Sequence, residues 1–166
     1  MGAQHPFYFC PTRREPQTLT YSDPFYMGGM EVTHALCDYA ANNFEGTGVV
    51  RQYKRVTLRE ITDGTSKTLL VGDKRLNVAI LGQWQSDDNE GYTAGWDEDT
   101  IRTTHRSPAA DTDDYGDLLF GSSHVGIANF VFADASVNAI SFEIDQAVFE
   151  NLGNKSDGKT IPAGSF

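Results

Sequence analysis

Carboxylate and aromatic side chains gather between residues 87 and 99, and their types and spacing suit two kinds of chemistry. Asp87, Asp88, Asn89 and Glu90 stand in four successive positions and are followed by a glycine. Calcium in proteins takes about six to eight oxygen ligands from carboxylates, amides and backbone carbonyls on a loop. The spacing differs from that of the regular Asp-rich calcium loop, but the residue types predict a Ca²⁺ site at these four positions.

A pair of carboxylates, Asp97 and Asp99, follows in the same stretch, near Tyr92, Trp96 and Trp84 in sequence. Glycoside hydrolysis uses two carboxyl groups roughly 5–9 Å apart. The pattern therefore fits a small glycosidase with Asp97 and Asp99 as the catalytic carboxyls. It fits equally a non-catalytic surface on which Tyr92, Trp96 and Trp84 stack against sugars. A third interpretation places the tryptophans in the core and the acids on a solvated loop, and the sequence leaves all three open.

Histidine and serine side chains are the remaining candidates for chemistry. The four histidines, His5, His34, His105 and His124, lack the spacing of a zinc site, and His34 is interpreted as a surface or capping residue. His124 shares a strand face with Ser122, but no nucleophile elbow and no placed acid complete a hydrolase triad. We assign His124 to the same ligand-binding surface as the aromatic residues.

The charge of the chain limits its partners. It has 166 residues, with 13 Lys and Arg against 23 Asp and Glu, for a net charge of −10. Ten acids and two bases fall between residues 87 and 117, so this stretch holds −8 of the −10. Such a surface repels phosphate backbones, and we expect no nucleic-acid partner. No apolar run is long enough to span a membrane, and the length predicts a single domain over residues 1–166.

Two cysteines, Cys10 and Cys37, are separated by 26 residues. An oxidising compartment would let them pair, and closing a loop of that size stabilises a protein by roughly 3–4 kcal/mol. In a reducing compartment they would be two buried thiols. The residues alone leave both interpretations open.

Proline and glycine divide the first half of the chain into short elements. Residues 1–30 hold four of the six prolines and are expected to be irregular. The elements expected here are an edge strand over residues 7–9, a helix over 31–43, an extended segment over 51–53, a helical turn over 57–64 opened by a Thr57–Glu60 capping box, and strands over 68–72 and 78–84.

The second half contains the clearest hairpin. Residues 127–133 and 137–142 are rich in strand-forming side chains, with a short turn between them. A helix over 146–152 follows, with Asp145 as its N-cap and Gly153 at the expected C-terminal cap.

The tail over residues 154–166 is polar and is expected to be loose. Short strands, long turns and brief helices together predict an α+β domain with a β-rich antiparallel sheet and a few short helices.

Three segments of the chain resemble one family. They are residues 59–74, residues 88–97, and residues 120–137, which run from Phe120-Gly121-Ser122-Ser123-His124 to Asp134-Ala135-Ser136-Val137. Together with Phe9-Cys10-Pro11 and Cys37-Asp38-Tyr39-Ala40, they are similar to the large planctomycete family of prepilin-like proteins. That family carries a C-terminal signature of His, nine residues, then Asp-Gly. The likeness covers about residues 7 to 153.

One position departs from that signature. Asp134 is followed by Ala135, where the family has glycine. In a tight hairpin this glycine serves a turn with positive φ, which alanine adopts at a cost on the order of 1 kcal/mol. We therefore expect a longer turn, or a turn of another type, at this point of the hairpin.

The resemblance implies a pilin-head-like fold and an exported, periplasmic or extracellular location. Usual members begin with a pilin-like N-terminal helix, which this sequence lacks, so the chain is expected to be the globular head. An exported location also favours a Cys10–Cys37 disulfide. The resulting hypothesis is a head domain with a binding or structural role that recognises a polysaccharide or other pilin-like subunits. The alternative is a small secreted glycosidase that uses the paired carboxylates.

Overall fold

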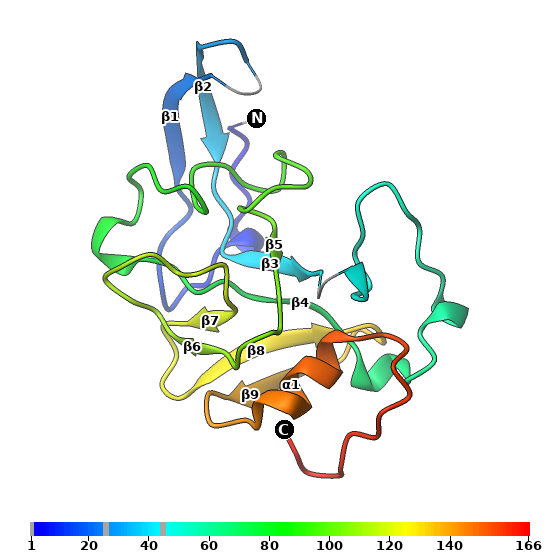
Figure 1. Cartoon of the computed structure of the whole chain (residues 1–166). Coiled ribbons are helices and arrows are strands. Elements are labelled where there is room, and N and C mark those ends of the chain that lie inside the picture. The colour runs from blue at the N-terminus through cyan, green and yellow to red at the C-terminus, as the bar shows by residue number, and fades with distance from the viewer. Residues whose placement is uncertain (1, 25–26, 44–45) are drawn as a thin grey trace.

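The computed structural model describes residues 2–24, 27–43 and 46–166 (Figure 1). These residues form one five-stranded sheet, two two-stranded sheets, one α-helix and several 3-10 turns. This is the predicted α+β class. The strands are β1 (Thr18–Asp23), β2 (Met30–Ala35), β3 (Tyr39–Asn42), β4 (Leu69–Asp73), β5 (Ile101–Arg102), β6 (Ala109–Ala110), β7 (Gly121–Ser122), β8 (Ile127–Phe132) and β9 (Val137–Ser141). The helical elements are η1 (Pro6–Tyr8), η3 (Leu58–Glu60), η4 (Thr65–Lys67), η5 (Val78–Ile80) and α1 (Gln146–Gly153).

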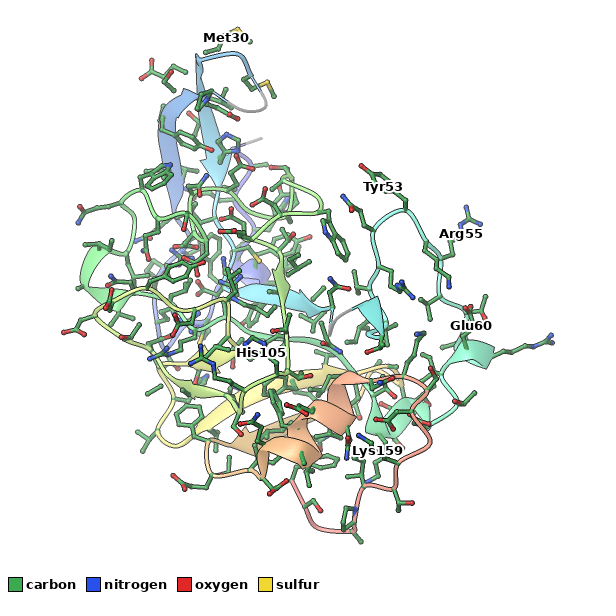
Figure 2. All side chains as sticks on the ribbon, in the orientation of Figure 1. Met30, Tyr53, Arg55, Glu60, His105 and Lys159 are labelled. Atoms are coloured by element: carbon green, nitrogen blue, oxygen red, sulfur yellow. The ribbon has the colours of Figure 1, made fainter. Side chains whose placement is uncertain are left out.

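The five-stranded sheet has the strand order β5-β3-β4-β8-β9. Its pairs are antiparallel except β3 with β5, which is parallel. β4 lies at the centre, and its pairing with β8 is irregular between Leu69 and Val71. The smaller sheets are the antiparallel β1–β2 hairpin, which projects from one end of the molecule in Figure 1, and the parallel β6–β7 pair. Met30 lies at the far end of this hairpin, where its side chain is exposed (Figure 2).

The core lies on one face of the large sheet. Because side chains alternate along a strand, Ala128, Phe130 and Phe132 of β8 all point to this face, and all are buried. Phe130 meets Phe120 and Phe149 edge to face, with ring centroids 5.2 and 5.5 Å apart. Phe149 comes from α1, so this aromatic cluster joins the helix to the sheet.

Several predicted elements are confirmed. The strand expected over residues 68–72 is β4, and the expected hairpin is β8 with β9. The Thr57–Glu60 capping box is present and opens η3, which is a 3-10 turn. The predicted C-terminal helix is α1, and the Asp145 carboxylate accepts a hydrogen bond from the Val148 N–H over 3.1 Å.

Five local predictions are wrong. Residues 1–30, expected to be irregular, contain β1, because the chain between the prolines at 16 and 24 pairs with β2. Residues 31–43 form β2 and β3, because pairing with β1 and β4 outweighs a weak helical spacing. The stretch 7–9 enters the turn η1, which has Pro6 at its first position. The stretch 78–84 begins with η5, capped when Asn77 accepts a hydrogen bond from the Ala79 N–H. The predicted extended segment 51–53 contains a turn instead.

Two backbone positions shape the large sheet. Gly72 on β4 leaves room for the Phe130 ring, which a Cβ at this position would overlap. Ala135, in the β8–β9 turn, has a φ of 68°, a left-handed conformation that is strained for alanine. The turn therefore keeps the conformation that a glycine would favour, although the sequence supplies alanine.

The chain after α1 returns to the core. Phe166 stacks on Phe132 with ring centroids 5.3 Å apart, and Ile161 also packs against the core cluster. Across the described residues, we find no helix that combines the length and apolar character needed to cross a bilayer.

Candidate functional site

The face of the large sheet opposite the core carries a row of small and aliphatic side chains. The pairings place Ala41, Val71, Val131 and Val137 side by side across β3, β4, β8 and β9. The core face of these strands is buried under α1, whereas Val137 on this open face is 65% exposed. The open face is therefore apolar without being sealed by a second layer.

Two adjoining cavities hollow this face, with volumes of about 430 and 370 Å³. Tyr8, Tyr39 and Val71 line both of them, so the cavities form one continuous depression, which we call the aromatic groove. Further lining residues of the larger cavity are Cys37, Ala40, Ala41, Val50, Tyr92, Gly95, Trp96, Thr100 and Ile101. Those of the smaller cavity are Phe7, Gly72, Asn129, Phe130, Val131 and Val137.

Aromatic rings from distant parts of the chain build the wall of the groove. Tyr8 of η1 stacks on Tyr92 with ring centroids 4.4 Å apart and planes 13° from parallel. The Tyr92 hydroxyl donates to the Ala3 carbonyl over 2.9 Å. Phe7 packs against Tyr8 and remains 69% exposed. Burial raises the pKa of the Tyr39 hydroxyl to about 12, so this group stays neutral at physiological pH.

The predicted ligand-binding residues divide between this groove and other places. Tyr92 and Trp96 line it. Trp84 lines a separate cavity and is 56% exposed. His124 lies elsewhere, with its Nε2 atom 3.5 Å from the Cys10 sulfur.

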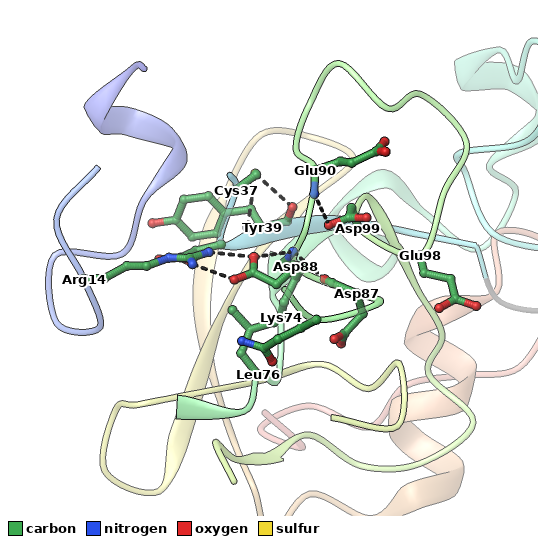
Figure 3. Close-up of polar contacts among 12 residues, drawn as sticks. Arg14, Cys37, Tyr39, Lys74, Leu76, Asp87, Asp88, Glu90, Glu98 and Asp99 are labelled. Carbon is green, nitrogen blue, oxygen red and sulfur yellow. Dashed lines mark hydrogen bonds and ion pairs between the residues drawn. The ribbon is translucent and has the colours of Figure 1, made fainter. Parts of the chain in front are cut away.

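A buried ionic network lies beneath the acidic stretch (Figure 3). Its centre is Asp88, whose two carboxylate oxygens accept hydrogen bonds of 2.6 and 2.7 Å from the Arg14 guanidinium. Lys74 approaches the same carboxylate at 3.3 Å, and Arg14 also contacts Asp38 at 2.6 Å. Burial lowers the pKa of Arg14, but Asp88 and Asp38 more than offset this effect, and the net shift is upward. Arg14 therefore stays charged although it is buried.

The network continues outward on both sides of this centre. Arg102 of β5 contacts Asp87 at 2.8 Å, and the side chains of both residues are buried. Arg13 contacts Asp111 at 2.9 Å and lies 3.6 Å from Asp38. Four basic and four acidic side chains thus form ion pairs in a region from which water is largely excluded.

The predicted calcium residues are therefore separated by the fold. Asp87 and Asp88 face guanidinium and ammonium groups, which supply the positive charge that an ion was expected to bring. Asn89 and Glu90 face Tyr21 instead: the Asn89 amide and the Glu90 carboxylate lie 2.8 and 2.6 Å from its hydroxyl. The structure does not bring the four side chains to one point.

The predicted catalytic pair lies beside the network. Asp99 is fully buried, and its carboxylate accepts a hydrogen bond of 2.9 Å from the Glu90 N–H. Burial, with a smaller contribution from Asp97, raises the pKa of Asp99 to about 7, which is a value typical of a general acid. The residues that line the two cavities of the aromatic groove include neither Asp97 nor Asp99.

The predicted disulfide is absent from the structure. Cys10 and Cys37 are both buried and both free. Cys10 lies beside His124, whereas the Cys37 thiol donates to the Tyr39 carbonyl over 3.2 Å. Burial raises the pKa of the Cys37 thiol, which favours its unreactive protonated form. The two thiols thus have different partners, and the expectation of a disulfide bond is corrected.

His34 is also placed differently from the prediction of a surface or capping residue. It is 2% exposed, lies on β2, and stacks on Tyr21 with ring centroids 5.3 Å apart. One Asp23 carboxylate oxygen lies 3.9 Å from its Nε2 atom. Ligand atoms of Asp23, His34 and Glu90 all lie within 4.8 Å of one another, so these three residues could hold a metal ion.

The motifs in the sequence do not identify Asp23, Tyr8, Tyr39 or the cations of the network as site residues. Asp23 and Glu90 are separated by 66 residues, and no local motif links them. Adjacent basic residues, as in Arg13-Arg14 and Lys74-Arg75, are a weak signal for buried cations that need acidic partners, because the exposed pair Lys54-Arg55 has the same pattern. Which acids those are depends on the long-range fold.

Comparison with known proteins adds a family assignment. The model of a family described as protein of unknown function (DUF1559) matches residues 2–147. No curated protein and no solved structure matches the chain. The match does not test the planctomycete source or the His–Asp-Gly signature, and both stay predictions. Because the match covers most of the sequence, the chain belongs to the DUF1559 family, which is of the prepilin-like type.

Proposed function

We propose that this chain is the exported head domain of a prepilin-like protein and that it recognises a partner subunit through the aromatic groove. The occupant that we assign to the groove is an apolar face of a helical segment of that subunit. The observation that carries the proposal is the open, apolar face of the large sheet, hollowed between η1 and β9.

The lining of the groove favours an apolar polypeptide over a charged or sugar ligand. The chain has a net charge of −10, yet the described residues that line the groove include no Asp, Glu, Lys or Arg. Sugars need several hydrogen-bonding side chains as well as aromatic faces. The hydrogen-bonding side chains of the lining are three tyrosines, Trp96, Thr100, Asn129 and Cys37, and the remaining lining residues are apolar. Two of these groups already have partners, because the Tyr92 hydroxyl donates to the Ala3 carbonyl and the Cys37 thiol donates to the Tyr39 carbonyl.

The glycosidase alternative has one observation in its favour. Asp99 has the raised pKa of a general acid and lies next to Asp97 in a hydrogen-bonded turn, in which the Asp99 N–H donates to the Asp97 carboxylate. However, Asp99 is fully buried, and a general acid must reach the glycosidic oxygen. Recognition without catalysis therefore accounts for more of the arrangement.

Two exposed valines offer a matched test. Val137 lines the groove and is 65% exposed, whereas Val125 is 99% exposed and does not line it. The probe is a synthetic amphipathic helical peptide with leucine and isoleucine on one face. Its binding is followed by the fluorescence of Trp96 in a Trp84→Phe background, since Trp96 lines the groove.

We expect Val137→Glu to weaken peptide binding at least tenfold and Val125→Glu to leave it unchanged, because a carboxylate in an apolar contact loses its hydration. Equal effects of the two substitutions would contradict a docking role for the groove. An oligosaccharide that binds the wild type and is lost in Trp96→Ala would support the glycan hypothesis instead. Release of a reducing sugar that stops in Asp99→Asn would support the glycosidase.

A further inference from the structure

We infer that Asp23, His34 and Glu90 form a binding site for a divalent first-row transition-metal ion such as Zn²⁺. The site lies between the β1–β2 hairpin and the loop that begins the acidic stretch. It is separate from the aromatic groove, and none of its three residues lines that groove.

The state of His34 is the first observation behind this inference. Its side chain is 2% exposed, and within the described part of the chain neither Nδ1 nor Nε2 has a hydrogen-bond partner. Buried polar atoms are nearly always hydrogen-bonded, since leaving one unpaired costs about 1–3 kcal/mol. Because neither ring nitrogen has a partner among the described residues, the buried imidazole indicates a bound ligand other than the surrounding side chains.

The groups that face the imidazole are the second observation. Nε2 of His34 lies 3.9 Å from an Asp23 carboxylate oxygen, too far for a hydrogen bond. Glu90 completes the triangle, and it is 3% exposed. Two carboxylates and a neutral imidazole are the oxygen and nitrogen donors that bind Zn²⁺ and related ions in proteins.

The spacing of the donors fits an ion after a small movement. Around a tetrahedral Zn²⁺ with bonds of about 2.1 Å, ligand atoms lie roughly 3.4 Å apart. The three donors here all lie within 4.8 Å of one another. Movement of each donor by under about 1 Å toward the centre reaches the bonding arrangement, which side-chain rotation within a rotamer supplies.

Contacts with Tyr21 hold two of the donors in place. Tyr21 stacks on His34 and donates to Glu90 over 2.6 Å, so one side chain orients two of the three donors. Such outer contacts are typical of metal ligands. Tyr21 also lines a cavity of about 390 Å³ with Trp84 and Asn89, so the residue that contacts two of the donors borders a solvent-filled space.

The donor set selects against calcium. Ca²⁺ binds oxygen ligands in large number, and a buried imidazole is not among them. We therefore expect Zn²⁺ to bind one per chain and Ca²⁺ to have no effect at the same concentration. The proposed metal site therefore differs from the calcium site expected at residues 87–90, and the two share only Glu90.

The test is thermal unfolding of the whole chain, first treated with chelator, then titrated with Zn²⁺ alone. A ligand that binds the native state raises the unfolding temperature. We expect a rise of about 5 °C or more at saturation, and one Zn²⁺ per chain by calorimetric titration. Co²⁺ in place of Zn²⁺ gives visible ligand-field absorption that reports the coordination directly.

Variants of the donors test whether these residues are responsible for the rise in unfolding temperature. Glu90→Gln keeps an acceptor for Tyr21 and removes the charge, and His34→Phe keeps a buried ring and removes both nitrogens. Both should abolish the rise, whereas Glu31→Gln, an exposed acid on the same hairpin, should retain it. If His34→Phe does not fold, the Zn²⁺ titration of Glu90→Gln alone tests the site.

Three results would overturn the inference. They are the absence of a Zn²⁺-dependent rise in the wild type, a rise that persists in Glu90→Gln, and a rise that Ca²⁺ produces equally. The second result would mean that the ion binds surface acids instead. Each of these results leaves the groove proposal intact, because the peptide assay does not involve this site.

Discussion

Two buried acidic clusters lie close together in this molecule, and different groups surround them. Around Asp88, the chain supplies its own cations: Arg14 binds both carboxylate oxygens, and Lys74 lies at 3.3 Å (Figure 3). Around Glu90, the facing groups are another carboxylate, Asp23, and an imidazole whose nitrogens have no hydrogen bonds within the described residues. The first cluster is electrostatically complete, and the second has the donors of a metal site.

An acidic stretch in a sequence can therefore have either of two structural outcomes. Crowded carboxylates in a sequence indicate a need for positive charge, but they do not say whether side chains or an ion supply it. Here the fold brings Arg14 from the N-terminal segment and Lys74 from the end of β4 to Asp88. The nearby residue Glu90 receives neither.

The largest effect is expected from breaking the complete cluster. Asp88→Ala leaves the Arg14 guanidinium and the Lys74 ammonium group buried without their shared carboxylate. Removing one partner of a buried ion pair typically costs about 3–5 kcal/mol. Urea unfolding should therefore show a loss of this size in the free energy of unfolding. A loss below about 1 kcal/mol would mean that water reaches the network.

Asp99 joins the two clusters, and its titration should be visible in stability. Burial raises the pKa of Asp99 to about 7, above the value of about 4 expected in the unfolded chain. The folded state therefore holds the proton more tightly, and stability falls as pH rises from about 4 to about 7. Asp99→Asn should remove that fall, with a relative gain of about 2–4 kcal/mol at pH 8 and little gain at pH 4.

The measurement is urea unfolding across this pH range in chelator-treated protein. The amide oxygen that Asp99→Asn introduces can still accept the hydrogen bond from the Glu90 N–H, so the fold around the loop is preserved. Parallel pH profiles for the variant and the wild type would show that Asp99 titrates normally.

Removing a carboxylate charge from the second cluster should change the free energy of unfolding much less than removing Asp88 does. Glu90→Gln removes one of two buried carboxylates that face each other while keeping the acceptor for Tyr21. In metal-free protein we expect the free energy of unfolding to change by less than about 1 kcal/mol, or to rise. A loss as large as that of Asp88→Ala, measured in the same urea series, would show that other groups of the protein already balance the charge of Glu90.

A substitution in the β8–β9 turn, distant from both clusters, should have a small effect of the opposite sign. Ala135 has a φ of 68° in an exposed turn, and glycine adopts that conformation without strain. Ala135→Gly should stabilise the protein by about 0.5–1 kcal/mol. Destabilisation in thermal or urea unfolding would indicate that the turn is not strained.

Local signals in the sequence predicted much of the second half of the fold. The β8–β9 hairpin and α1 were recognisable because strand-forming runs, an Asp145 cap and a short turn act over a few residues. β2 was mistaken for a helix, because its structure depends on pairing with β1 and its own spacing is ambiguous. Such pairing is a property of the fold that short windows do not contain.

The candidate sites were predictable only in part, for the same reason. Tyr92 and Trp96 were found because they stand together in sequence, but their partners Tyr8 and Tyr39 come from other segments. Glu90 was predicted as a metal ligand together with Asp87, Asp88 and Asn89, whereas Asp23 and His34, its partners in the proposed site, reach it only through the β1–β2 hairpin. The bare nitrogens of His34 are a property of the folded chain, and no residue pattern would have revealed them.

The most direct test of this contrast between the clusters is anomalous diffraction at the zinc absorption edge, from crystals of the whole chain grown with Zn²⁺. We expect one strong peak within bonding distance of the carboxylates of Asp23 and Glu90 and a ring nitrogen of His34. We expect no peak at Asp88, where Arg14 and Lys74 already supply the charge. A peak at Asp88, or no peak at Asp23, His34 and Glu90 with Zn²⁺ in excess, would contradict the proposed difference between the two clusters.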